Sequence, residues 1–107
     1  MKVCTYVDHL DEAILAKEAG VDEVILGNML FSRFGKISPK RFSKFSQEVK
    51  ALNLRVVFDW DILMTEKVFN ERVEELKHIE WECFDAIRVQ DPGALHWVKN
   101  NLPGKAI

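Results

Sequence analysis

The sequence is poor in several residue types that define common classes of protein. Its 107 residues include two cysteines, three prolines, five glycines and one tyrosine. Cys4 is expected within a strand and Cys83 in a turn, so no disulfide framework is indicated and a reducing compartment is expected. No apolar run approaches the ~20 residues of a membrane span, and no signal peptide follows Met1. We therefore expect a cytoplasmic protein that does not enter a membrane.

Several catalytic and binding motifs are also missing. The sequence contains no glycine-rich phosphate loop and no Gly-x-Ser-x-Gly nucleophile elbow. Its two cysteines and three histidines do not follow any recognised spacing for zinc. The sequence therefore predicts neither a phosphate-binding loop, nor a serine nucleophile, nor a metal site.

What remains is the composition of one folded domain. Hydrophobic residues make up 48% of the chain and charged residues 30%, which is ordinary for a globular protein. The net charge of −2 conceals an uneven distribution, because residues 33–55 hold seven Lys and Arg residues against one Glu. Two interpretations of this basic segment stay open: a solvated helix face, or a surface that faces a polyanion such as RNA.

The most informative stretch is residues 84–93, which read FDAIRVQDPG. An apolar strand over Ala86–Val89 meets the polar pair Gln90 and Asp91, and a helix is expected to start at Pro92. Asp91 is a good N-cap for that helix, because its carboxylate can accept a hydrogen bond from a free N–H group. The polar pair therefore lies where a strand ends and a helix begins.

The same order recurs along the chain and predicts alternating strands and helices. Expected strands cover Lys2–Val7, Glu23–Leu26, Arg55–Asp59 and Ala86–Val89, and Lys105–Ile107 reads as the start of another. Expected helices run over Leu10–Ala19 with Asp8 as cap, from Ser38 to Asn53, from Thr65 to Ile79 and from Pro92 to Leu102. Their predicted inward side chains are Leu10, Ala13 and Ile14; Phe42, Phe45, Val49 and Leu52; Phe69, Val73, Leu76 and Ile79; and Leu95, Val98 and Leu102. Such alternation predicts an α/β fold with a parallel sheet.

Polar residues gather at the expected carboxyl ends of these strands, where ligands bind in parallel α/β folds. The residues are Asp8, His9, Asn28, Arg33, Asp59, Asp61, Gln90 and Asp91. Asp8 and Asp91 are also explained as helix caps, whereas Asp59 and Asp61 are not obvious caps. Neighbouring carboxylates can act as acid and base. Arg33 is the best candidate for binding an anion, although an exposed salt bridge explains it equally well.

Four segments form an ordered set of motifs: residues 19–27 (AGVDEVILG), 31–33 (FSR), 56–63 (VVFDWDIL) and 84–93 (FDAIRVQDPG). In order and interval they are similar to the opening of the collagenase-like peptidase family of unassigned catalytic type. That family has an Ala-Gly-Ala-Asp turn into a VYLG strand, an FSAR-like loop, and VNTL and IVQDLG strand ends. The chain departs from this pattern at Asp61, which replaces the Asn of VNTL, and at residues 7–9, which replace Pro-Ala-Gly.

The resemblance implies four β/α units with parallel strands, which is half of a TIM (β/α)8 barrel; an open flavodoxin-like parallel sheet is the alternative. By position it implies catalytic roles for Asp61, Gln90 and Asp91. It implies substrate-binding roles for Asn28 and Arg33. For Asp59 a substrate-binding role is expected because this residue ends a strand and is not an obvious helix cap.

The resemblance also sets expectations about activity and cofactors. The family is nominally proteolytic, and its relatives include iron–sulfur proteins that hydroxylate ubiquinone precursors or RNA bases. A 4Fe-4S cluster is therefore implied for a full-length parent, but none is expected within this segment, because Cys4 and Cys83 match none of the cluster cysteines.

The length of the chain sets the expected assembly. A complete barrel needs ~250 residues, so we expect a homodimer, or pairing with a missing C-terminal half, and no activity of this segment alone. The alternative function is a non-catalytic module that binds an anionic ligand or RNA.

Overall fold

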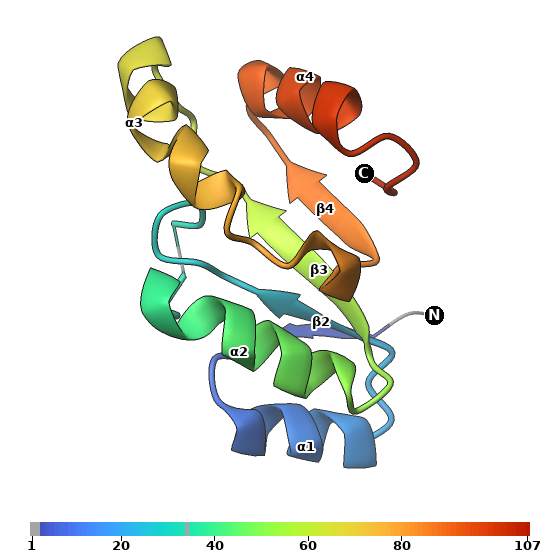
Figure 1. Ribbon diagram of the computed structural model, residues 1–107. Coiled ribbons are helices and arrows are strands. Elements are labelled where there is room, and N and C mark those ends of the chain that lie inside the picture. The colour runs from blue at the N-terminus through green and yellow to red at the C-terminus, as the bar shows by residue number, and fades with distance from the viewer. Residues whose placement is uncertain (1–2, 34) are drawn as a thin grey trace.

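Four strands and four helices alternate along the chain in the computed structural model, which describes residues 3–33 and 35–107 (Figure 1). The strands are β1 (Cys4–Tyr6), β2 (Glu23–Leu26), β3 (Arg55–Trp60) and β4 (Ala86–Val89). The helices are α1 (Leu10–Glu18), α2 (Pro39–Lys50), α3 (Glu66–Leu76) and α4 (Pro92–Asn101), with a short 3₁₀ helix, η1 (Trp81–Cys83), before β4. None of these helices is long and apolar enough to cross a membrane.

The four strands form one sheet in the order β1-β2-β3-β4, and every pair is parallel. Because each crossover between neighbouring parallel strands is right-handed, the helices are placed on the same face of the sheet. Figure 1 shows α1 and α2 side by side on that face. This order is that of half a (β/α)8 barrel and confirms the prediction. The flavodoxin-like alternative is wrong, because it would place β1 between two other strands.

Local capping chemistry explains where most helices begin and end. The Asp91 carboxylate accepts a hydrogen bond from the Ala94 N–H at 3.0 Å, and Thr65 accepts one from the Val68 N–H at 3.2 Å. Asn53 follows α2 with a φ of 61°, in the left-handed region that ends a helix. These caps are the ones that the sequence predicted.

The start and the buried face of α1 differ from the prediction. Asp8 does not cap this helix: His9 is the N-cap residue, and Glu12 Oε1 accepts the N–H groups of Asp8 and His9 at 3.0 and 3.1 Å. Ile14 is 38% exposed, whereas Ala13 and Ala16 are buried. Small alanine side chains on the inner face let α1 lie close to the sheet.

Other boundaries moved by a few residues. β1 is shorter than expected and β3 ends one residue later, at Trp60; Lys2 lies outside the described residues. α3 ends at Leu76, so the buried Ile79 belongs to the following connection. In α4 the buried positions are Ala94 and Val98, while Leu95 and Leu102 are only partly buried.

An aromatic cluster fills the space between the sheet and its helices. Phe58 on β3 is fully buried at its centre, with the rings of Phe42, Trp81 and Phe84 at centroid distances of 5.7, 4.9 and 5.3 Å. Phe31 contributes from the β2–α2 loop, 5.8 Å from Phe58. One strand, one helix and two connections therefore share a single apolar contact region.

The second face of the sheet has no described helix over it, and we call it the open face. Its residues alternate with those of the core along the strands: Cys4, Tyr6, Glu23, Ile25, Arg55, Val57, Asp59, Ala86 and Arg88. A groove of about 530 Å³ crosses it between β1 and the C-terminal residues. Ala106 continues the sheet there, because its carbonyl accepts the Ile87 N–H at 2.9 Å.

The aromatic cluster yields a stability prediction. Replacing Phe58 by Ala should lower the free energy of unfolding by about 3–5 kcal/mol, because it removes a fully buried ring from a packed site. Urea denaturation measures this loss. Leu63→Ala is the control, since Leu63 is 71% exposed and its loss should change stability by no more than about 0.5 kcal/mol. Equal effects of the two substitutions would contradict the proposed core.

Candidate functional site

Polar side chains meet at the edge of the sheet where the strands end, which we call the carboxyl edge. Asp8 lies just beyond β1, Asn28 beyond β2, Asp61 directly after β3 and Gln90 directly after β4. Because all four strands are parallel, these residues lie at the same edge. In (β/α) barrels this edge carries the active site.

The most tightly connected polar group is the Asp59 cluster, formed by Tyr6, Ser32, Asp59 and Arg88. The Asp59 side chain is fully buried, and its Oδ2 accepts hydrogen bonds from Ser32 Oγ at 2.7 Å and from Tyr6 Oη at 3.0 Å. Arg88 lies opposite Asp59 on β4, with its Nε 4.0 Å from Asp59 Oδ1, and its Nη1 donates to Tyr6 Oη at 3.3 Å. Asp59 Oδ1 is buried and has no hydrogen bond.

The position of Asp59 is costly, because a carboxylate loses its hydration when it is buried. Two hydroxyl donors and one guanidinium offset that cost. The Arg88 side chain is 48% exposed, so it extends from the buried carboxylate into the open face. The cluster thus holds a cationic group at a fixed place beside the carboxyl edge.

The same cluster changes the acidity of Tyr6. Partial burial, the hydrogen bond to Asp59 and the negative charge of that carboxylate raise the pKa of the Tyr6 phenol, and the nearby Arg88 charge opposes them. Tyr6 therefore stays protonated at neutral pH, and its O–H donates a hydrogen bond to Asp59.

Arg33 and Asp61 form a second group at the edge. The backbone N–H of Arg33 donates to Asp61 Oδ1 at 2.8 Å, and the side-chain Nε of Arg33 lies 3.9 Å from Asp61 Oδ2. The backbone N–H of Asp61 donates in turn to the carbonyl of Phe31 at 3.1 Å. Arg72 on α3 donates to the carbonyl of Leu30. These bonds attach the loop that follows β2 to the end of β3.

Asn28 shapes this loop from within. Its side chain is buried, and its Oδ1 accepts the Leu30 N–H at 2.9 Å, which forms a tight turn. The loop then returns so closely that a Cβ on Gly35 would lie 2.5 Å from the Asn28 carbonyl oxygen. Only glycine leaves room for this approach.

Asp91 and Gln90 occupy different environments at the end of β4. The two oxygens of Asp91 accept backbone N–H groups, from Ala94 at 3.0 Å and from Met64 at 3.4 Å. Gln90 is exposed. Asp91 and Gln90 both lie at the carboxyl edge. Of the described residues at this edge, Arg33 lines the nearby cavity between β1 and the loop after β2, whereas Gln90 does not.

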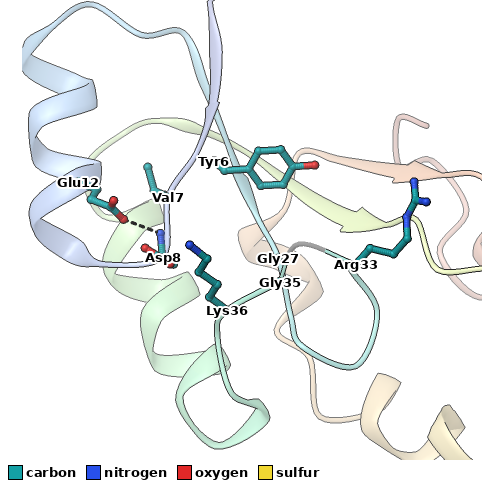
Figure 2. Close-up of a pocket in the computed structure, with 8 residues that line it drawn as sticks. All are labelled: Tyr6, Val7, Asp8, Glu12, Gly27, Arg33, Gly35 and Lys36. Atoms are coloured by element: carbon teal, nitrogen blue, oxygen red, sulfur yellow. Dashed lines mark hydrogen bonds between the residues drawn. The ribbon is translucent and has the colours of Figure 1, made fainter.

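A cavity of about 580 Å³ opens between the end of β1, the start of α1 and the loop after β2, and we call it the edge cavity. Figure 2 shows its lining, which is Tyr6, Val7, Asp8, Glu12, Gly27, Arg33, Gly35 and Lys36. Arg41 on α2 fixes its rim by donating to the Asp8 carbonyl at 2.9 Å.

Two carboxyl groups, those of Asp8 and Glu12, share a hydrogen bond at one end of the edge cavity. A hydrogen bond between their side chains raises the pKa of Asp8 and lowers the pKa of Glu12. Asp8 is therefore the partner that keeps a proton longer as the pH rises. The positive charge of Lys36, and that of His9 at 3.7 Å when its ring is protonated, oppose the rise in the pKa of Asp8.

The described residues include no group of three or more His, Cys, Asp and Glu side chains that could hold a metal ion. Cys4 is exposed on β1, whereas Cys83 is buried at the end of η1, with its thiol pKa raised by burial. A 4Fe-4S cluster requires four ligands, usually thiolates. The two cysteines of this chain do not fit such a cluster.

Sequence reasoning placed Asp59, Asp61, Arg33 and Gln90 at the edge but missed Tyr6, Ser32, Arg88 and Lys36. For Tyr6 and Arg88, the alternation of side chains between the two faces of a strand was the available signal. Arg88 is the only charged residue within Ala86–Val89, and a charge in an otherwise apolar strand suggests an opposite charge on the neighbouring strand. Ser32 and Lys36 gave no signal, because their positions depend on the path of the loop.

The strand order and the polar carboxyl edge identify the structural class of the protein. It is an α/β half-barrel, a class of fold that carries ligand sites at the carboxyl ends of its strands. The model of peptidase family U32 matches residues 8–107. The chain therefore belongs to peptidase family U32, as the resemblance to collagenase-like peptidases predicted. Comparisons with curated proteins and with solved structures gave no match.

The Asp59 cluster predicts the titration of Tyr6. This is the only tyrosine of the chain, so ultraviolet absorbance follows it directly. We expect a midpoint above the ordinary value of about 10, and a lower midpoint in Asp59→Asn, which removes the negative charge. Because the pKa is raised on folding, the related stability is complete below the unfolded pKa and is lost as the pH rises through the folded one.

Asp11→Asn is the matched control, since Asp11 is an exposed carboxylate on α1. It should leave the midpoint unchanged. A wild-type midpoint at or below the ordinary value, or one that Asp59→Asn does not move, would contradict the geometry of the cluster.

Proposed function

We propose that this protein supplies the substrate-binding half of a peptide-hydrolysing site, at the carboxyl edge of β1–β4. Membership of peptidase family U32 supports the chemistry. The observation that carries the proposal is the fully buried Asp59, held by Tyr6 and Ser32 and set against a partly exposed Arg88. A folded chain retains such a costly carboxylate where it fixes a neighbouring group.

Peptide hydrolysis needs a group that stabilises negative charge on the carbonyl oxygen and a group that moves a proton. In this proposal the Arg88 guanidinium binds the carbonyl oxygen, because Asp59 and Tyr6 aim it into the open face. Asp61 and Gln90 are the proposed partners of the attacking water. Asn28, Arg33 and Asp59 shape the substrate site, and Asp91 acts by holding the loop at Met64.

A four-stranded sheet offers only part of the wall of a barrel site. We propose that a second half closes it, either a second copy of this chain or a C-terminal half-barrel. A two-fold axis along the barrel would place the edge formed by β4 and Ala106 of one copy beside β1 of the other and leave no free edge. The uncovered open face supports this idea, since such faces favour association. The proposed location is the cytoplasm.

Two other roles have less support. An iron–sulfur hydroxylase of quinone precursors or RNA bases would have to take all of its cluster ligands from outside this segment, because Cys4 and Cys83 do not fit. An RNA-binding module would use the basic segment. However, Lys50 binds Asp85 at 2.8 Å and Arg55 binds Glu23 at 2.9 Å, so part of its charge is neutralised within the protein.

Peptide binding tests the proposed function. The probe is a fluorescent collagen-type peptide with both ends blocked, followed by anisotropy. We expect Arg88→Gln to weaken binding at least tenfold, because it removes the guanidinium, and Arg88→Lys to weaken it less, because it keeps the charge. Lys99→Gln, at an exposed position of α4, is the matched control and should bind as the wild type does.

Near-ultraviolet circular dichroism checks that each variant is folded. Absence of peptide binding by the wild type, or equal binding by wild type and Arg88→Gln, would refute the proposal.

Sedimentation equilibrium at micromolar concentration tests the assembly. We expect twice the monomer mass of 12.4 kDa, and a tenfold or greater shift toward monomer in Cys4→Glu, which places a charge at an exposed position of the open face. Leu15→Glu is the control, since Leu15 is 64% exposed on α1. A monomeric wild type would exclude the homodimer and leave a separate C-terminal half as the partner.

A further inference from the structure

The edge cavity carries charges of both signs, and they are separated in space. Asp8 and Glu12 lie at one end with Lys36 beside them, and Arg33 lies at the other, across the ring of Tyr6 (Figure 2). We infer that the edge cavity binds a short peptide through both of its free ends. This inference rests on the proposed function, to which it adds a subsite for free di- and tripeptides beside the peptide site on the open face.

The size of the cavity suits such a ligand. Its volume of about 580 Å³ lies within the range of about 300–1,000 Å³ that small-molecule sites occupy. The Tyr6 ring provides an apolar side between the two charged ends, as the figure shows (Figure 2). A peptide of two or three small residues can lie along it with its termini apart.

The ammonium end of the ligand is assigned to Asp8 and Glu12. Glu12 is held in place by the N–H groups of Asp8 and His9, and Arg41 holds the Asp8 carbonyl. The Glu12 carboxylate and the backbone that carries Asp8 are therefore held in place before a ligand arrives, which lowers the entropy lost on binding. Lys36 lies beside Asp8 in Figure 2, and its positive charge acts to lower the pKa of the Asp8 carboxyl group, so this group already responds to a cation within the protein.

The carboxylate end is assigned to Arg33. The guanidinium carries five N–H donors in a planar fork that suits a carboxylate. The Arg33 Nε lies 3.9 Å from Asp61 Oδ2, and the Arg33 side chain is 63% exposed. The Arg33 side chain lies on the hydroxyl side of the Tyr6 ring (Figure 2).

Backbone forms the wall between the two ends. A Cβ on Gly27 would lie 2.8 Å from the Gly35 Cα, and one on Gly35 would lie 2.8 Å from the Gly27 carbonyl oxygen. The two glycines therefore bring both backbone segments together without side chains. The Gly35 N–H already donates to the Ser32 carbonyl at 3.1 Å and the Gly27 carbonyl accepts the Ile37 N–H at 3.3 Å, so this wall contributes shape to the cavity.

The test is a titration of the ¹⁵N-labelled full chain with Ala-Ala-Ala and three derivatives: N-acetylated, C-amidated, and blocked at both ends. We expect saturable shifts at Gly27, Gly35 and Lys36 with the free peptide. Each single block should weaken binding at least tenfold, because each removes one charge that the cavity recognises. The doubly blocked peptide should give no saturable shifts at these residues.

Matched variants assign the two ends. Asp8→Asn should weaken the free and the C-amidated peptide but change little for the N-acetylated one, and Arg33→Gln should show the opposite pattern. Lys40→Gln, at an exposed position of α2, is the control. The same spectra show whether each variant is folded.

Equal binding of free and blocked peptides, loss of affinity on blocking only one end, or no binding of the free peptide would each overturn the inference. The blocked collagen-type peptide separates this result from the proposed function. If it still binds in an Arg88-dependent way, the peptide site on the open face stands and only the edge cavity is misassigned.

Discussion

The buried carboxylate of Asp59 is the constraint on which the whole carboxyl edge depends. Its partners come from β1, β4 and the loop after β2, so one side chain joins three distant parts of the chain. Removing one partner of a buried charge costs about 3–5 kcal/mol in comparable sites. The positions of Tyr6, Ser32 and Arg88 are therefore coupled, and a change at any one of them affects the shape of the site as a whole.

Much of the fold could be predicted from sequence because its signals are local. Asp91 before Pro92, Thr65 before an amphipathic segment, and Asn53 after one are short-range patterns, and the structure uses each as predicted. The order of β/α units predicted parallel strands for the same reason. The prediction failed at the start of α1, where His9 and not Asp8 is the N-cap residue, and Glu12 reaches back to the N–H groups of Asp8 and His9.

The candidate site was harder to predict, because it depends on the register between strands. Asp59 and Arg88 are direct partners across β3 and β4, and no spacing within either segment reveals this. The loop after β2 brings Ser32 beneath Asp59 and Lys36 toward Asp8 only after Asn28 and Gly35 have folded it back. The catalytic roles of Asp61, Gln90 and Asp91 stay predictions.

The sequential order of the strands also bears on how the protein is made. Each strand pairs with the one synthesised just before it, so every new β/α unit can add to a growing sheet as it leaves the ribosome, and most pairing needs only short loop closure. The hydrogen bond from Arg88 to Tyr6 spans 82 residues. It can form only after β4 has been added, so the polar cluster is completed at the end of folding, when the sheet that supports it already exists.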